Sequence, residues 1–296
     1  MDYESLINKS LDNVFPENSG DITIDAARYS LLAGGKRLRP KMMFMTYKML
    51  GNDPSFLDDV SYYATTLEMI HTYSLIHDDL PCMDNDDLRR GKPTCHKVYG
   101  AGIATLAGDL LLNTAMERLM KIVCDKPQYA YASYRLAALA GSEGMIGGQS
   151  IDISSENIEI PLERLYELQA KKTGALIENA VVTPYYLING TTADSAATDK
   201  NVKLLKELAS HIGLAFQIRD DILDVTANQE LLGKSVGKDE RDHKSTFVTL
   251  LGFEEANNKL KEEINKASEV LDSLSGVGYD VEEYRDHVGY LLVRGN

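Results

Sequence analysis

The chain has 296 residues, a formal net charge of −14 and a hydrophobic content of 44%. Nucleic acid phosphates repel such an acidic chain, so the charge argues against a nucleic-acid-binding protein. The chain contains no run of about 18 apolar residues, and its acidic start lacks the basic and apolar regions of a signal peptide. We therefore expect no stable membrane insertion.

Apolar residues recur at helical spacing through most of the chain, while Pro, Gly and Asn mark the ends of the predicted helices. Helices are expected at 2–14, 21–32, from 41 to a turn at 52–54, from that turn to 78, at 101–112, from 127, at 161–188, from about 201, at 247–274 and at 281–293. No strand with sustained alternation of apolar and polar residues is predicted. No Pro/Gly/Ser-rich linker interrupts the pattern. The sequence thus predicts an all-α protein with a single domain over residues 1–296.

An acidic cluster follows the long helix that ends near residue 78. Asp78, Asp79 and Asp84 precede the basic pair Arg89-Arg90. Clustered carboxylates repel each other, and burying them is costly unless a cation neutralises them. Oxygen ligands followed by an arginine pair suit Mg²⁺ and a phosphate-bearing substrate. The alternative, if the cluster is taken alone, is a solvated acidic turn that ends a helix.

A second acidic cluster strengthens the metal hypothesis. Four polar residues follow one another at i, i+3, i+4 and i+7, which places them on one face of an otherwise apolar helix: Gln217, Asp220, Asp221 and Asp224. Two carboxylate faces on apolar helices could meet across a cavity only with cations between them. The two clusters together predict a shared metal site.

These motifs resemble the two aspartate-rich motifs of the trans-isoprenyl diphosphate synthases. The first reads Asp78-Asp79-x-x-x-x-Asp84 and the second Asp220-Asp221-x-x-Asp224. Further matches occur in the family's order, at Gly34 to Pro40, Lys172-Thr173-Gly174 and Gly233-Lys234. The similarity spans roughly residues 33–245, and the four-residue spacer of the first motif is similar to bacterial farnesyl and to bacterial and plant geranylgeranyl enzymes.

The resemblance implies a single large helical bundle of the isoprenoid synthase type around a central cavity. It also implies a Mg²⁺-dependent prenyltransferase that joins isopentenyl diphosphate to dimethylallyl or geranyl diphosphate, head to tail, by ionisation, attack and proton loss. A homodimer is expected, with three Mg²⁺ ions per site bridged by diphosphate. The implied metal ligands are Asp78, Asp79, Asp84, Asp220, Asp221 and Asp224, of which Asp78, Asp84 and Asp220 are the first choice.

The same resemblance assigns residues to two substrates. Isopentenyl diphosphate is expected to contact Lys36, Arg39, His71 and Arg90, and the allylic diphosphate to contact Arg89, Lys172, Lys234 and Lys244. The catalytic residues implied by the family are Lys172, Thr173, Gln217, Asp78 and Asp220. Oxygen dipoles at Lys172-Thr173 and at Gln217 would stabilise the allylic cation without trapping it covalently.

Product length is expected to depend on Tyr73 and Ser74. Tyr73 lies five residues before Asp78, roughly 7.5 Å down a helix that rises about 1.5 Å per residue. Ser74 is small and leaves room beneath the aspartates. An aromatic residue at the position of Tyr73 is similar to the farnesyl synthases, so farnesyl diphosphate is the expected product. The alternative is that Tyr73 merely packs between helices.

Other interpretations explain less of the sequence. A geranylgeranyl or longer-chain synthase is the nearest alternative, and a class I terpene cyclase would share the fold and the first motif but not the second. An all-α metal-dependent phosphohydrolase could use His71, His77, Asp78 and a distant aspartate as ligands. It would leave the basic segment Gly34–Arg39, Asp221 and Asp224 unexplained. A helical scaffold without enzymatic activity would leave each of these polar clusters without a function.

The cysteines indicate neither a zinc site nor a disulfide framework. Cys82, Cys95 and Cys124 are odd in number and show no C-x-x-C spacing. Unpaired cysteines fit a reducing compartment, so a cytoplasmic location is expected.

Overall fold

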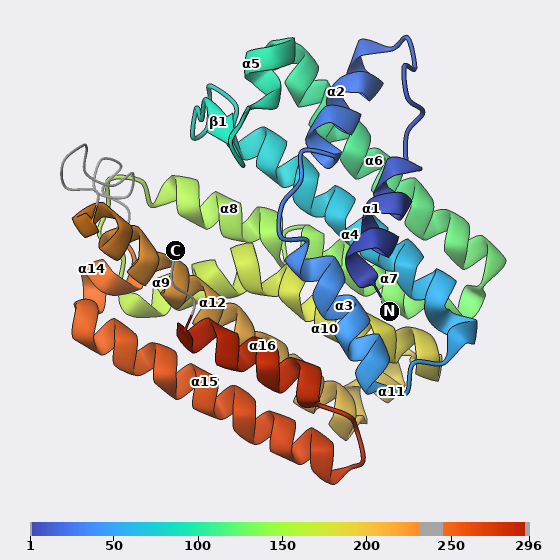
Figure 1. Cartoon of the computed structure of the whole chain (residues 1–296), viewed down its shortest axis with the longest axis vertical. Helices are drawn as coiled ribbons and strands as arrows, with labels where there is room; N and C mark the ends of the chain where they lie inside the picture. The colour runs from blue at the N-terminus through green and yellow to red at the C-terminus, as the bar shows by residue number, and fades with distance from the viewer. Residues whose placement is uncertain (1, 231–244, 294–296) are drawn as a thin grey trace. The chain divides into compact units, whose positions relative to one another are not determined.

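The computed structural model describes residues 2–230 and 245–293. Its contacts divide the chain into two compact units. Unit 1 comprises residues 1–47, 52–137 and 183–193, and unit 2 comprises 48–51, 138–182 and 194–296. Helices dominate both, so the prediction of an all-α chain is confirmed (Figure 1). The expectation of a single domain over 1–296 stays a prediction.

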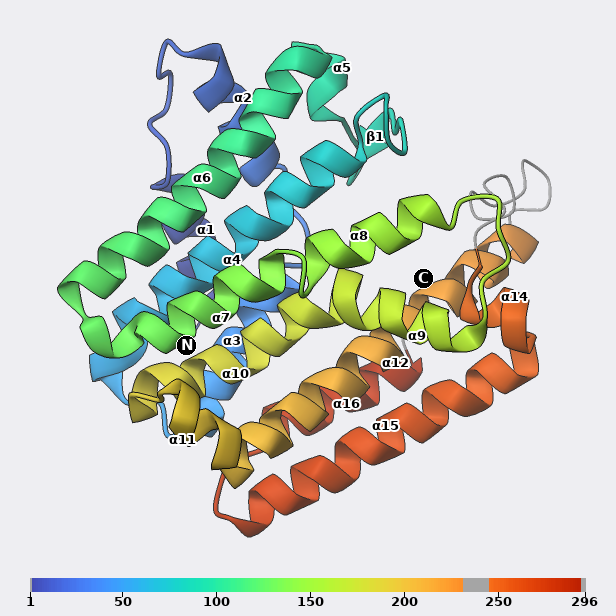
Figure 2. The same ribbon diagram turned by 180° about the vertical axis from the view of Figure 1, so that it is seen from behind.

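Unit 1 is built around α4 and α6, which pack side by side in both views (Figures 1 and 2). Its helices are α1 (Tyr3–Asp12), α2 (Ile22–Leu31), most of α3 (Leu38–Met49), η1 (Pro54–Phe56), α4 (Leu57–Asp78), α5 (Cys95–Tyr99), α6 (Ala101–Asp125), η2 (Pro127–Tyr129) and the first part of α7 (Ala130–Ala140). α4 is buried along most of its length, because apolar residues cover nearly all of its faces rather than one stripe. It ends at Asp78, as predicted.

A short hairpin in unit 1 was not predicted. β1 (Leu88–Arg89) pairs antiparallel with β2 (Lys92–Pro93). The two residues between the strands have positive φ, 55° at Arg90 and 74° at Gly91, as a tight two-residue hairpin turn requires. Strands of two residues are too short to show an alternating pattern, which is why the sequence gives no sign of them.

Unit 2 has α12 and α15 as its longest helices, packed against each other, with α16 against α15 (Figure 2). Its elements are α8 (Met145–Ser154), α9 (Leu162–Gln169), the π-helical segment η3 (Ala170–Gly174), the first part of α10 (Ala175–Asn189), α11 (Ala193–Thr198), α12 (Lys200–Glu230), α14 (Phe247–Leu251), α15 (Phe253–Gly276) and α16 (Glu282–Val293). Within the predicted helix 161–188, the π-helical segment η3 therefore separates α9 from α10.

In the part of the chain that the structure describes, no helix is both long and apolar enough to cross a membrane.

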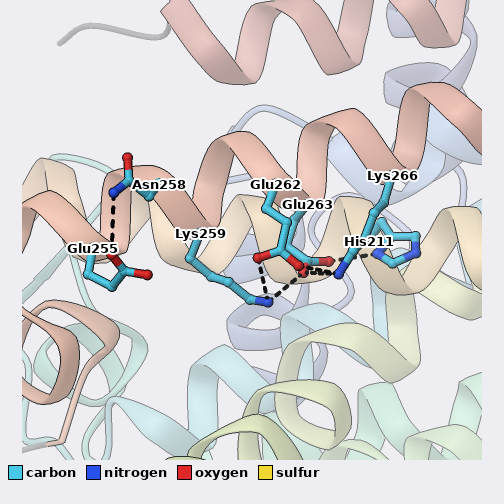
Figure 3. A network of polar contacts seen from close by, with 7 residues as sticks. All are labelled: His211, Glu255, Asn258, Lys259, Glu262, Glu263 and Lys266. Carbon is cyan, nitrogen blue, oxygen red and sulfur yellow. Dashed lines mark hydrogen bonds and ion pairs between the residues drawn. The ribbon is translucent and has the colours of Figure 1, made fainter.

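A buried carboxylate links α12 to α15 within unit 2 (Figure 3). Glu263 is 3% exposed, and its oxygens lie 2.6 Å from His211 Nδ1 and 3.2 Å from Lys259 Nζ. Burial raises the pKa of Glu263, but hydrogen bonds from His211 and Lys259 outweigh burial and hold this pKa at about 2. The ionised side chain therefore stabilises the folded unit.

We expect Glu263→Gln to remove stability in a pH-dependent way. The folded pKa of about 2 lies below the ordinary value of 4.5, so the stabilisation is complete above pH 4.5 and is lost as the pH falls towards 2. Near neutral pH the variant should lose about 2–3 kcal/mol of unfolding free energy, and this difference should shrink on acidification. Urea unfolding across this pH range measures it. Glu255→Gln, an exposed change on the same helix, is the control, and a pH-independent loss in Glu263→Gln would contradict the assignment.

Candidate functional site: two polar clusters

The first aspartate cluster forms a compact turn at the end of α4. The Asp84 N–H donates to the Asp78 carbonyl at 2.9 Å, so the chain folds back and brings these two residues together. Asn85 follows with φ 50°, a conformation that asparagine tolerates better than most residues. The loop thus brings the backbone of Asp84 against that of Asp78.

Asp79 and Arg89 bind each other within the same turn. The Arg89 guanidinium donates through Nε at 2.8 Å and through Nη2 at 2.5 Å to one Asp79 oxygen. Asp79 is buried, and burial raises its pKa although Arg89 opposes the shift. The Asp79 carboxylate is therefore neutralised by the Arg89 guanidinium. This pairing favours an indirect role for Asp79 over direct metal ligation.

A cationic cluster lies beside α4. Arg39 Nη1 lies 3.2 Å from His71 Nε2, so the guanidinium donates to a neutral imidazole. Burial first, and then the positive charge of Arg39 and Arg90, hold the pKa of His71 well below its ordinary value. Burial also lowers the pKa of Arg39. This surplus of positive charge around an uncharged histidine favours an anionic ligand.

Arg37 and Arg39 have different environments although they are neighbours in the sequence. Arg37, 5% exposed, donates to Glu68 Oε1 at 2.7 Å and to the Leu31 carbonyl at 2.8 Å. The charge of Arg37 is thus neutralised within unit 1. No role was predicted for this residue. Lys36, by contrast, is exposed just before α3, where a ligand could reach it.

Arg90 bends over the glycine turn that precedes α3. Its Nη1 donates to the Gly34 carbonyl, and a Cβ on Gly35 would lie 2.3 Å from the Arg90 guanidinium carbon. Gly35 also has φ 118°, which strongly favours glycine. The structure therefore brings Arg90, Arg39 and His71 into one region of unit 1.

Gln217 and Asp221 of the second cluster line a cavity of about 160 Å³ in unit 2. Lys172 Nζ lies 2.5 Å from Asp152 Oδ2. Thr173 Oγ1 donates to Gln217 Oε1 at 3.2 Å, and Gln217 Nε2 donates to Asp221 Oδ1 at 3.1 Å. Five residues from distant parts of the sequence thus line one cavity. Four of them were predicted as site residues, and Asp152 was not.

Asp221 is anchored through both oxygens. Besides the Gln217 amide, it accepts the Phe247 N–H at 2.9 Å, and it is 5% exposed. Asp220 is half-buried and Asp224 exposed on the same helix. This geometry assigns Asp221 to holding Gln217 and the start of α14, and leaves Asp220 and Asp224 more accessible to a ligand.

Asp152 is a cavity-lining residue that was not predicted. It follows the glycine-rich stretch 144–148 on α8, and no charge pattern in the sequence singled it out. The signal that could have revealed it is Gly148, where a Cβ would lie 2.2 Å from the Lys172 backbone nitrogen. This contact brings α8 and η3 together and so places Asp152 beside Lys172. Lys234 and Lys244 lie outside the described residues.

No group of three or more Asp, Glu, His or Cys side chains within residues 2–230 and 245–293 is arranged to hold a metal ion. Magnesium is commonly bound in another way, by one or two carboxylates together with substrate phosphate oxygens and water. The oxygen donors of Asp78 and Asp84 in unit 1, and of Asp220 in unit 2, fit that kind of binding.

Comparisons with known proteins point to one family. The family model for polyprenyl synthetase matches residues 21–275. The chain is 43% identical to the farnesyl diphosphate synthase of Bacillus subtilis, covering 83% of this chain and 81% of the relative. It is 42% identical to the large subunit 1 of a chloroplastic heterodimeric geranylgeranyl pyrophosphate synthase of Arabidopsis thaliana, covering 93% and 72%.

A solved structure is similar over almost its whole length. The crystal structure of a geranyltransferase from Helicobacter pylori, complexed with magnesium and isoprenyl diphosphate, has a TM-score of 0.83 and 32% identity. The match covers 99% of this chain and 97% of that one.

We expect Gly148→Ala to disturb η3. The added methyl group has no room against the Lys172 backbone, so unfolding free energy should fall by about 1–3 kcal/mol despite the better helix propensity of alanine. Gly276→Ala is the matched control, because it is also at a helical position and meets nothing within 4 Å. Denaturant unfolding of both variants measures the difference, and equal stability would show that the close approach of α8 to η3 is not required.

Proposed function

Because the chain belongs to the polyprenyl synthetase family, we propose that it joins isopentenyl diphosphate to dimethylallyl and geranyl diphosphate, head to tail, to give farnesyl diphosphate. The chain is a prenyltransferase of the trans type, and the proposal concerns its substrates and product. The observation that carries it is on α4. This helix ends in paired carboxylates, and two turns earlier it carries the neutral His71 against Arg39.

The cationic cluster is assigned to isopentenyl diphosphate. Lys36, Arg39, His71 and Arg90 would hold its diphosphate. The Arg39 guanidinium lies 3.2 Å from His71, and burial, followed by the positive charge of Arg39 and Arg90, lowers the pKa of His71 and keeps it neutral. A neutral His71 can donate one hydrogen bond to a phosphate oxygen without adding charge. This substrate needs only to be held, since its diphosphate is retained in the product.

The carboxylate clusters are assigned to the allylic diphosphate through Mg²⁺. Asp78 and Asp84 in unit 1 and Asp220 in unit 2 would be the direct ligands, with three ions per site as the family resemblance implies. The relative from Helicobacter pylori, which was solved with magnesium and isoprenyl diphosphate, supports this choice of metal. Bound Mg²⁺ would stabilise the departing diphosphate as a Lewis acid and hold it in position.

The cavity of unit 2 is assigned to the allylic cation. Lys172, oriented by Asp152, would bind the leaving diphosphate. Thr173 and the Gln217 amide, which Asp221 orients, would turn oxygen dipoles towards the positive carbon after the carbon–oxygen bond breaks. Such dipoles stabilise positive charge without forming a bond to it. The double bond of isopentenyl diphosphate then attacks, and a proton leaves the new carbon skeleton.

Farnesyl diphosphate is proposed as the product because of Tyr73. Relatives that make farnesyl and geranylgeranyl products are about equally similar to the chain, so the family alone does not select a length. Tyr73 is 5% exposed, and burial raises its pKa to about 12. A rigid, buried ring below Asp78 is well placed to limit the growing tail.

We also propose a cytoplasmic homodimer, as the resemblance implies. The exposed apolar side chains of Leu106 and Met120 on α6 are the ones that we assign to its interface.

Loss of Asp78 or Asp220 should abolish turnover without unfolding the protein. Each of Asp78→Ala and Asp220→Ala removes a proposed ligand, and we expect turnover to fall roughly 1,000-fold or more. Incubation with Mg²⁺, isopentenyl diphosphate and geranyl diphosphate measures turnover, and circular dichroism checks folding. Asp58→Ala, at an exposed position on α4, is the control. Activity within about tenfold of wild type in either variant would contradict the two-cluster metal site.

Product length should change when Tyr73 is truncated. Tyr73→Ala removes the proposed floor and should yield products longer than farnesyl diphosphate, whereas Ser74→Phe should add bulk and shorten them to geranyl diphosphate. Chromatography of the dephosphorylated products gives the chain lengths. Unchanged products in both variants would place the floor elsewhere, and geranylgeranyl diphosphate from the wild type would replace the proposed product.

A further inference from the structure

The Nε2 edge of the His77 ring lies against the backbone of α6. A Cβ added to Gly108 would lie 2.2 Å from His77 Nε2 and 2.5 Å from its Cδ2. His77 Nε2 also lies 3.1 Å from the Thr105 carbonyl, one turn earlier on α6. The ring is thus held against α6 by a hydrogen bond, in space that exists only because residue 108 has no side chain.

Among the residues that the structure describes, only His77 lies close enough to Gly108 to require a glycine there. It is buried in the interior of the 25-residue helix α6, and its φ is not positive. Glycine destabilises such a helix by about 1 kcal/mol relative to alanine. Gly102 on the same helix meets nothing within 4 Å, so the close approach of a ring distinguishes Gly108.

His77 also packs against Tyr73. The two ring centroids lie 5.7 Å apart with an interplanar angle of 80°, an edge-to-face contact one turn apart on α4. The Tyr73 hydroxyl is buried and has no hydrogen-bond partner among the residues described. Packing alone therefore determines where the Tyr73 ring lies, and His77 supplies part of that packing.

We propose that Gly108 and His77 are positioning residues that set product length through Tyr73. This inference rests on the proposed function, because it assumes that Tyr73 limits the growing tail. Gly108 lets His77 lie against α6, and His77 in turn fixes the depth of the Tyr73 ring. A side chain at residue 108 displaces the histidine towards Tyr73, since the backbone of α6 blocks the opposite direction.

Gly108→Ala tests the inference through the product ratio. We expect the share of geranyl diphosphate to rise roughly tenfold relative to farnesyl diphosphate, the size of effect that one methylene group makes in an apolar pocket. Gly102→Ala is the matched control, with the same chemical change on the same helix, and it should leave the product ratio unchanged. A residue with a merely structural role would lower stability or turnover and leave the ratio as it was.

His77→Ala gives an independent test if Gly108→Ala fails to fold. Removing the ring frees Tyr73 on one side, so longer products should appear. In the double variant Gly108→Ala with His77→Ala, the new methyl group meets no ring, and the product ratio should match that of His77→Ala alone. Coupling of this kind is expected only if the two residues act through the same contact.

The outcomes separate the inference from the proposed function. No prenyl transfer by the wild type would overturn both. Longer products from Tyr73→Ala, with wild-type ratios in Gly108→Ala and His77→Ala, would overturn the inference alone. Unchanged products from Tyr73→Ala would overturn the inference together with the proposed floor.

Discussion

The carboxylates at the end of α4 are the feature on which the first site depends, because they lie where a helix least tolerates negative charge. The carbonyl ends of a helix carry about half a negative charge, so acidic residues there are repelled by the helix as well as by one another. Asp78 is the last residue of α4 and Asp79 follows it. The turn is stable only if positive charge is supplied.

The chain supplies part of that charge itself. The hairpin after the turn returns Arg89 to Asp79, with one oxygen accepting two guanidinium bonds. Asp78 and Asp84 are brought together in the same turn by a backbone hydrogen bond. Asp79 is thus neutralised within the chain, and the turn that it helps to hold carries the other two aspartates of the motif.

The same division appears among the arginines and on α12. Arg37 forms an ion pair with Glu68, whereas Arg39 lies against a neutral histidine. On α12, Asp221 is anchored by the α14 backbone and orients Gln217, while Asp220 and Asp224 remain accessible. Burial and hydrogen bonding therefore give neighbouring residues of the same type different environments.

The sequence alone determined the helical class, the end of α4 at Asp78 and both aspartate motifs, because helical periodicity and motif spacing are local properties. Tertiary structure decided which aspartate of the first motif pairs with an arginine and which arginine is buried against a carboxylate. The local sequence does not distinguish Asp79 from Asp78 or Arg37 from Arg39; the difference arises from contacts with Arg89 in the hairpin and with Glu68 on α4. Asp152 and the contact of Gly108 with His77 depend on helices approaching more closely than a Cβ allows. A close approach of this kind requires a glycine, but the sequence does not show which residue will contact that glycine.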